Sequence, residues 1–178
     1  LCEKMNASNT VVIKNGRLKA YNTDGIGFLR SLKEEAPEID ISESVFFCLG
    51  AGGAARAICS VLAYNGAKKI YIASRTLSRV KELVEDINEK FAPVAEQVDM
   101  QDTELLKKSI AASNVIMNNT GLGMPASLDK TPIPKEYLSH AQLCFDATYN
   151  PSKTRFLTEA EQVGCKIMNG LGMSLYQG

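Results

Sequence analysis

From residue 44 onward, short apolar runs alternate with amphipathic stretches, and this alternation limits the folds open to the chain more than any other feature. Apolar runs with the character of strands lie at 45–49, 69–74, 94–98, 114–118, 142–147 and 165–168. Helical periodicity occupies the intervals at 54–65, 77–91, 102–112 and 154–163. Strands that alternate with helices build right-handed βαβ units. We therefore predict an α/β fold with a doubly wound, mostly parallel six-stranded sheet and helices on both faces.

Ahead of this alternation, the sequence predicts a β-hairpin and one helix. Asn15-Gly16 separates the extended runs 9–14 and 17–21, and this pair fits the two left-handed positions of a type I′ turn. Apolar residues at helical spacing from Ile26 predict a helix that ends before Pro37, with Thr23 or Asp24 as its N-cap. We expect residues 1–22 to form a separate short unit, and residues 23–178 to form one domain.

Charge and composition argue against several classes of protein. The 178 residues carry 20 Lys+Arg and 20 Asp+Glu, so the net charge gives no basis for binding nucleic acid or an anionic membrane. No apolar run approaches the roughly 20 residues that cross a bilayer. The five cysteines are scattered and the one histidine is His140, which argues against a disulfide framework or a metal site. We expect a globular protein of the reducing cytoplasm, without a metal.

A glycine-rich loop follows the first strand of the alternating region. The sequence G-x-G-x-x-A begins at Gly50, directly after a buried strand and at the start of a helix. In a Rossmann-like fold, the first glycine allows a tight turn, the second admits a pyrophosphate, and the third small residue, here Ala55, lets the helix pack closely. We predict that a dinucleotide cofactor lies against Gly50, Ala51, Gly52, Gly53 and Ala54.

The end of the second strand predicts which dinucleotide binds. NAD enzymes usually place an Asp or Glu there, on the ribose 2′-hydroxyl. This sequence has Ser74, Arg75, Thr76 and Arg79 instead, which suit the 2′-phosphate of NADP. The alternative is an ordinary solvated helix start, but cations at that end oppose the helix dipole. The sequence therefore predicts NADP as the cofactor.

Seven spaced motifs together resemble the shikimate dehydrogenase family, which includes the quinate/shikimate dehydrogenases. The resemblance extends over roughly residues 5–178. It rests on Asn9-Thr10, Asn22-Thr23-Asp24-Gly25, Gly50–Ala55, Ser74-Arg75-Thr76-x-x-Arg79, Asn119–Met124, Asp146-x-x-Tyr149-Asn150-Pro151 and Gly170–Met173.

The resemblance implies a reaction and a place for the cofactor. The reaction is the reversible, NADP-linked reduction of 3-dehydroshikimate to shikimate, in aromatic amino acid biosynthesis. The nicotinamide would lie beside Ala147 and Gly170. One departure is Ser74, where the family often has Asn; the shorter side chain weakens contacts to the adenosine and leaves the basic pair intact.

The resemblance also implies how a substrate is held. Asn9 and Asp24 would hydrogen-bond its hydroxyl groups, and Tyr149 and Gln177 would close the site from the other side. Asp24 is the one member of this set suited to acid–base catalysis, and in the family it acts with a lysine from a preceding substrate domain. The motifs of that domain do not occur here, so residues 1–22 are interpreted as its last strands. We expect these 178 residues to bind NADP with negligible turnover.

Several alternatives stay open at this point. The chain is equally compatible with a paralogue that acts on quinate, since residues outside it would decide that preference. A non-catalytic NADP-binding module, or one part of a multi-enzyme fusion, also fits the motifs, as does either a monomer or a homodimer. Asp24 as a simple helix cap and Tyr149 as a packed loop residue are the structural alternatives to their roles in binding.

Overall fold

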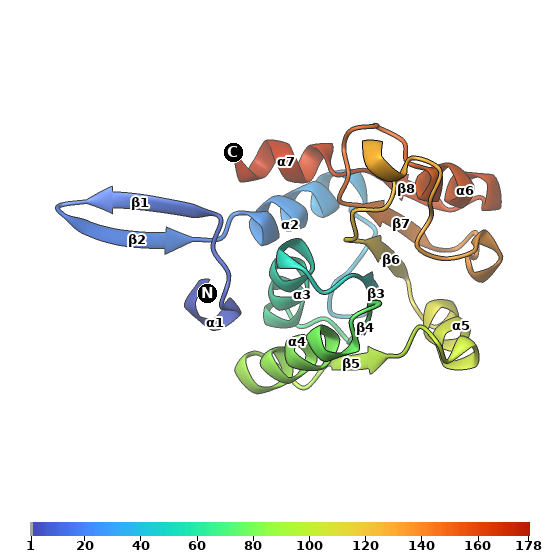
Figure 1. Cartoon of the computed structure of the whole chain (residues 1–178), viewed down its shortest axis with the longest axis horizontal. Coiled ribbons are helices and arrows are strands. Elements are labelled where there is room, and N and C mark those ends of the chain that lie inside the picture. Colours follow the sequence, from blue (N-terminus) through green and yellow to red (C-terminus); the bar gives the residue numbers. More distant parts are fainter. Residues whose placement is uncertain (1) are drawn as a thin grey trace.

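The structure, a computed structural model, describes residues 2–178 (Figure 1). Its strands are β1 (Thr10–Lys14), β2 (Arg17–Tyr21), β3 (Val45–Leu49), β4 (Lys69–Ala73), β5 (Ala95–Val98), β6 (Val115–Asn118), β7 (Leu143–Asp146) and β8 (Lys166–Met168). Its α-helices are α1 (Cys2–Met5), α2 (Asp24–Glu35), α3 (Gly53–Tyr64), α4 (Leu77–Lys90), α5 (Thr103–Ala111), α6 (Arg155–Val163) and α7 (Leu171–Gln177). Two short 3₁₀ helices are η1 (Pro125–Ser127) and η2 (Lys135–Tyr137).

The central sheet confirms the predicted architecture. Six strands pair in the order β5-β4-β3-β6-β7-β8, and every pair is parallel. The chain runs outward from β3 to β5, returns to the middle at β6, and then runs outward in the other direction. In sheets of this kind, the crevice at the carboxyl ends of the two middle strands is where ligands bind. Here those two strands are β3 and β6.

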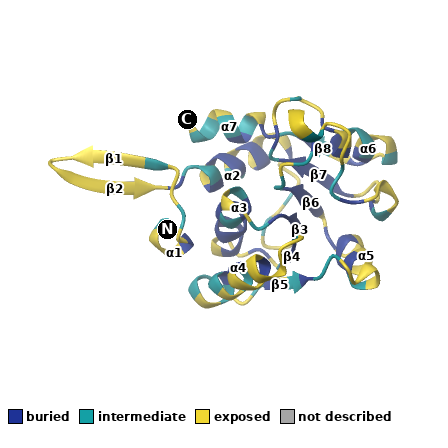
Figure 2. Cartoon of the chain, in the orientation of Figure 1, coloured by how far each residue is buried: buried dark blue, intermediate teal, exposed yellow. Residues whose placement is uncertain are grey.

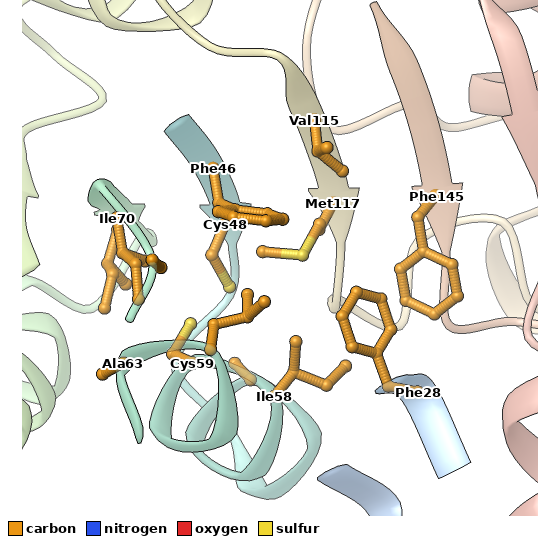
Figure 3. Close-up of a cluster of buried hydrophobic side chains, with 14 of the residues drawn as sticks. Phe28, Phe46, Cys48, Ile58, Cys59, Ala63, Ile70, Val115, Met117 and Phe145 are labelled. Carbon is orange, nitrogen blue, oxygen red and sulfur yellow. The ribbon is translucent and has the colours of Figure 1, made fainter. Parts of the chain in front are cut away.

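Apolar cores on both faces of the sheet bury the helices against it. On one face, Phe28 of α2 and Ile58 of α3 pack against Met117 and Phe145 (Figure 3). The rings of Phe28 and Phe145 meet edge to face, with their centroids 4.9 Å apart. On the other face, α5 and α6 cover a second core that includes Phe156. The prediction of helices on both faces is therefore confirmed.

The predicted hairpin is also present and stands away from the rest of the fold. Lys14 pairs with Arg17, so the loop is Asn15-Gly16, and both loop residues have positive φ values of 52° and 72°. Figure 1 shows β1 and β2 projecting from the body, and Figure 2 colours them almost entirely as exposed. Apolar side chains on the hairpin such as Ile13 (74% exposed) consequently lie in solvent.

The structure differs from the sequence-based prediction at two helices. The pattern did not predict α7, a seven-residue helix that packs along α2 (Figure 1). Thr23 does precede α2, but its side chain does not cap the helix. Its backbone already has helical dihedral angles, and its hydroxyl accepts a hydrogen bond from Asn9 (3.0 Å). Instead, Asn22 Oδ1 accepts a bond from the backbone N–H of Gly25 (3.4 Å).

Three further features of the described residues 2–178 bear on the class of protein. None of their helices has both the length and the apolar character required to cross a bilayer. No group of three or more His, Cys, Asp or Glu side chains in this range is placed to hold a metal ion. All five cysteines are free thiols, and Cys48 and Cys144 are buried in strands as the sequence predicts.

We predict that Phe28→Ala destabilises the protein far more than truncation of an exposed apolar residue. Phe28 is fully buried, so its loss removes apolar contacts and leaves a cavity, at a cost of about 3–5 kcal/mol in the free energy of unfolding. Ile13→Ala on the hairpin is the control and should cost about 0.5 kcal/mol or less. Denaturant unfolding of both variants measures this, and equal losses would contradict the assignment of the core.

Candidate functional site

A hollow of about 460 Å³ lies at the carboxyl ends of β3, β4 and β6, and is called the switch-point hollow below. Its walls are formed by the loops after these three strands. The lining residues are Leu49, Gly50, Ala51, Gly52, Ala73, Ser74, Arg75, Thr76, Arg79, Met100, Asn119, Thr120, Gly121, Leu122 and Pro132. Most of the predicted cofactor residues are thus brought together at one place.

Gly50 fixes the geometry of the first loop. It has a φ of +116°, a region that disfavours residues with a side chain. A Cβ atom at Gly50 would lie 2.8 Å from the backbone oxygen of Asn119 in the loop after β6. The backbone N–H of Gly50 also donates to Ala73 O of β4 (2.8 Å). A glycine is therefore required where these three strands end together.

Gly52 and Gly53 leave an open cradle at the start of α3. A Cβ atom built at either residue would meet no other atom within 4 Å. No side chain caps the first turn of α3, so its backbone N–H groups point toward the hollow without a side-chain acceptor. Such a helix start carries a partial positive charge and binds phosphate groups. This arrangement fits the predicted pyrophosphate position.

Arg75 and Arg79, from the loop after β4 and the start of α4, also line the switch-point hollow. Both are exposed, and neither forms an ion pair with a carboxylate in the described part of the chain. The first turn of α4 contains no acidic residue, and Thr76 does not cap it with its side chain. Ser74 Oγ accepts a bond from the N–H of Thr76 (3.4 Å), which closes a turn around Arg75. This wall is suited to a dianionic phosphate.

A second hollow adjoins the first and shares with it the loop after β6. It has a volume of about 490 Å³. Its lining residues are Ala54, Asn119, Thr120, Gly121, Met124, Pro125, Ala147, Thr148, Tyr149 and Asn150. The predicted nicotinamide neighbours Ala147 and Gly170 are in direct contact, since a Cβ at Gly170 would lie 2.1 Å from Ala147 O. The two adjoining hollows thus offer one place for each half of a dinucleotide.

Asn9 and Asp24 lie side by side at the start of α2. The Asn9 amide nitrogen donates to Asp24 Oδ1 (2.8 Å) and to Thr23 Oγ1 (3.0 Å). Asn9 Oδ1 accepts from the backbone N–H of Thr23 (3.0 Å) and from the hydroxyl of Thr10 (3.1 Å). The polar groups of Asn9 are thus engaged within the chain, where they hold the Asp24 carboxylate, and the role of Asn9 in binding a substrate hydroxyl stays a prediction.

Gln177 is brought to the same helix by close packing of α7 on α2. A Cβ at Gly27 would lie 2.5 Å from Met173 O and 3.2 Å from the backbone nitrogen of Gln177, so only glycine permits this approach. Gln177 Oε1 is buried and has no hydrogen-bond donor among the described residues. Tyr149, by contrast, is 54% exposed at the rim of the second hollow. The roles of these residues in binding substrate stay predictions.

Sequence reasoning assigned no role to two buried polar residues beside the second hollow, Asn118 and Asp146, although Asp146 begins one of the quoted motifs. Asp146 is fully buried at the end of β7. Burial raises the pKa of its carboxyl group, while hydrogen bonds from Thr148, Thr154 and Asn118 act in the opposite direction. One sequence feature could have indicated them. Both are the last residues of otherwise apolar strands, where burying a polar side chain costs free energy unless it has hydrogen-bond partners.

Comparisons with known proteins agree with this geometry. The family model for shikimate/quinate 5-dehydrogenase matches residues 32–132. A shikimate dehydrogenase (NADP(+)) of Caldanaerobacter subterraneus subsp. tengcongensis is 41% identical over 175 residues, which cover 98% of this chain and 60% of the relative. The chain therefore spans about 60% of the length of such a curated relative.

Solved structures give the same result. A shikimate 5-dehydrogenase from Listeria monocytogenes, in complex with shikimate and NAD, is 40% identical with a TM-score of 0.91, over 99% of this chain and 62% of the other. A quinate dehydrogenase from Corynebacterium glutamicum, in complex with NAD, is 30% identical with a TM-score of 0.89, over 99% and 61%. With the glycine cradle and the sheet topology, these matches show that the chain belongs to the shikimate/quinate 5-dehydrogenase family.

Proposed function

We propose that this chain is the cofactor-binding part of an NADP-dependent shikimate dehydrogenase, which interconverts 3-dehydroshikimate and shikimate in aromatic amino acid biosynthesis. The observation that carries the proposal is the pair Arg75 and Arg79, which lines the same hollow as the glycine loop and has no carboxylate partner among the described residues. A site for a neutral or cationic ligand would not combine two free guanidinium groups with an uncapped helix start.

The cofactor's adenosine end would lie in the switch-point hollow. Gly52 and Gly53 would receive the pyrophosphate at the start of α3, while Arg75, Thr76 and Arg79 would bind the 2′-phosphate. The two solved relatives described above hold NAD, whereas the relative from Caldanaerobacter subterraneus is named for NADP(+), so both dinucleotides occur among the relatives. In this chain the end of β4 offers no carboxylate for a free 2′-hydroxyl, and its positive charge favours NADP.

The nicotinamide would lie beside Ala147 and Gly170 and supply the hydride when it is bound. The chain's own residues would hold and orient the substrate. Asp24 uses Oδ1 to accept from Asn9, which leaves its other oxygen to accept from a substrate hydroxyl. Gln177 Oε1 is a buried acceptor that lacks a donor, a state that costs about 1–3 kcal/mol until a ligand donor satisfies it.

Quinate is the second candidate substrate. A quinate dehydrogenase is among the solved structures that match nearly the whole chain. Shikimate and quinate both present hydroxyl groups that Asp24 and Gln177 suit, so these residues favour neither. The relatives' names and the identity of about 40% favour shikimate.

We also propose that residues 1–22 belong to a second structural unit, the substrate domain. The support is that β1 and β2 form their own two-stranded sheet and are exposed along nearly their whole length. An isolated hairpin of this kind is marginally stable at best in water. Further polypeptide would be needed to cover Val11, Ile13 and Leu18.

The state of the cysteines bears on the cellular compartment. Five free thiols, with Cys48, Cys59, Cys144 and Cys165 buried, support the proposal that the protein works in a reducing cytoplasm. The homodimer stays a prediction, as do the alternatives of a non-catalytic NADP-binding module and of a multi-enzyme fusion.

We predict that the chain binds NADP⁺ at least about tenfold more tightly than NAD⁺, because two charge-assisted interactions reach the 2′-phosphate. The double variant Arg75→Ala/Arg79→Ala should bind both dinucleotides equally. Arg17→Ala removes an exposed guanidinium from the hairpin and should leave the preference unchanged. Isothermal titration measures all of these affinities. Equal binding of NAD⁺ and NADP⁺ by the unmutated chain would contradict the assignment of the arginine pair.

We predict negligible oxidation of shikimate by residues 1–178 alone. The motif that carries the family's lysine partner of Asp24 does not occur in them, so the proton transfer lacks one of its two groups. A steady-state assay with shikimate and NADP⁺ measures the rate, and a titration of the same sample with NADP⁺ confirms that the protein is folded and binds. Robust turnover would show that the chain's own residues suffice.

The proposed domain division predicts a difference in hydrogen exchange. Backbone amides of the hairpin, such as those of Val11 and Ile13, should exchange far faster than those of Phe46 and Phe47 in the central sheet, because the exposed hairpin opens at little cost. Exchange followed by NMR or mass spectrometry measures this difference. Equal protection of β1 and β3 would argue that the hairpin is an integral part of the same domain.

A further inference from the structure

Asp146 is a fully buried carboxylate whose partners are all neutral. Its Oδ1 accepts from the backbone N–H of Thr148 (2.9 Å). Its Oδ2 accepts from the Asn118 amide (2.8 Å) and from the Thr154 hydroxyl (2.7 Å). It forms no ion pair within the described residues 2–178. Burying a carboxylate without a cation beside it is costly in free energy, so the position of Asp146 calls for a specific explanation.

On the β6 side, Asp146 determines which way the Asn118 amide faces. An ionised carboxylate can only accept, so Asn118 must direct its NH₂ group toward it. The same NH₂ group donates to Leu122 O (3.2 Å). Asn118 Oδ1 is then left to accept from the N–H (3.1 Å) and the hydroxyl (2.6 Å) of Thr120. The shape of the loop at 119–122, which separates the two hollows, therefore depends on Asp146.

On the β7 side, Asp146 holds the loop that carries Ala147 and Tyr149. Its bond to the N–H of Thr148 forms a local turn directly after the strand. Thr148 O in turn accepts from the N–H of Gly170 (3.1 Å). The loops after β6 and β7, which line the second hollow, and the loop after β8, which contacts Ala147, are thus tied to a single carboxylate.

Thr154 anchors the network from behind. Its hydroxyl donates to Asp146 and also accepts from the N–H of Leu157 (3.3 Å), which caps α6. Its side chain lies against Gly123, where a Cβ would be 2.9 Å from Thr154 Cβ. None of these bonds involves Gly52, Arg75 or Arg79, so the network does not bond to the residues proposed to bind the phosphates, although the loop at 119–122 also lines the switch-point hollow.

We propose that Asp146 is a positioning residue that holds the second hollow in the form that receives the nicotinamide half of the dinucleotide. This inference rests on the proposed function and adds to it a residue that touches neither cofactor nor substrate. It predicts that a change at Asp146 weakens binding of the nicotinamide half more than that of the adenosine half, because Arg75, Thr76 and Arg79 form no hydrogen bond with the network.

The test compares two probes on the isosteric variant Asp146→Asn. NADPH carries both halves, and the emission of its reduced nicotinamide reports whether that ring is in water. Adenosine 2′,5′-bisphosphate carries the adenosine end alone. In the variant we expect a smaller emission change at a fixed, sub-saturating NADPH concentration, because less NADPH is bound. If the loops then adopt the competent form a tenth of the time, NADPH affinity falls about tenfold, while affinity for the bisphosphate stays within about twofold.

Two sets of controls keep the result interpretable. Asp40→Asn changes an exposed carboxylate that makes a similar turn with Ser42 (2.8 Å to its N–H) and should alter neither probe. If Asp146→Asn does not fold, as judged by its unfolding midpoint, Thr154→Val removes one of the three donors and should shift NADPH alone, by about threefold. Thr154→Ser retains the hydroxyl and should restore wild-type behaviour.

Three results would decide against the inference. Unchanged NADPH emission and affinity in the folded Asp146→Asn variant would show that the network does not hold the second hollow. Equal weakening of both probes would show a general structural role. Failure of the unmutated chain to bind either probe would overturn the proposed function as well, and this outcome is distinct from the first two because it appears without any substitution.

Discussion

The contact between Gly50 and the backbone of Asn119 is the constraint on which the candidate site depends. It joins the ends of β3 and β6, the two strands between which the chain reverses its direction across the sheet. No side chain fits between the two loops at this point, and a hollow lies on either side of it. The switch-point hollow opens toward β4, and the second hollow opens toward β7. Both halves of the site follow from one close approach of the backbone.

Electrostatic differences then give the two hollows different chemistry. Arg56, on α3, is largely buried and forms ion pairs with Glu82 (2.8 Å) and Asp86 of α4. Its charge therefore joins the two helices and is not free for a ligand. Arg75 and Arg79 precede and begin the same helix α4 without such partners in the described chain. The second hollow is instead backed by an acceptor, Asp146, among neutral donors. A chain with zero net charge therefore contains two distinct local environments.

The sequence was sufficient for features that depend on neighbours along the chain. The strand–helix alternation, the Asn15-Gly16 turn and the glycine loop all involve local patterns, and the structure confirms them. It was insufficient where distant residues meet. Asp146 receives bonds from Asn118, 28 positions away, and no local pattern reveals that pairing. Helix α7 is short and forms where Gly27 allows it to approach α2, a tertiary effect that periodicity cannot detect.

The most direct test of the account is a map of the backbone amide NMR shifts on addition of NADP⁺. The central claim is that one dinucleotide spans the two hollows. We predict shifts at residues 50–54, 74–79, 119–122 and 147–149, and none in the hairpin at 10–21. Shifts confined to the hairpin or to the face covered by α5 and α6, or the absence of any shift at a saturating concentration, would contradict the account.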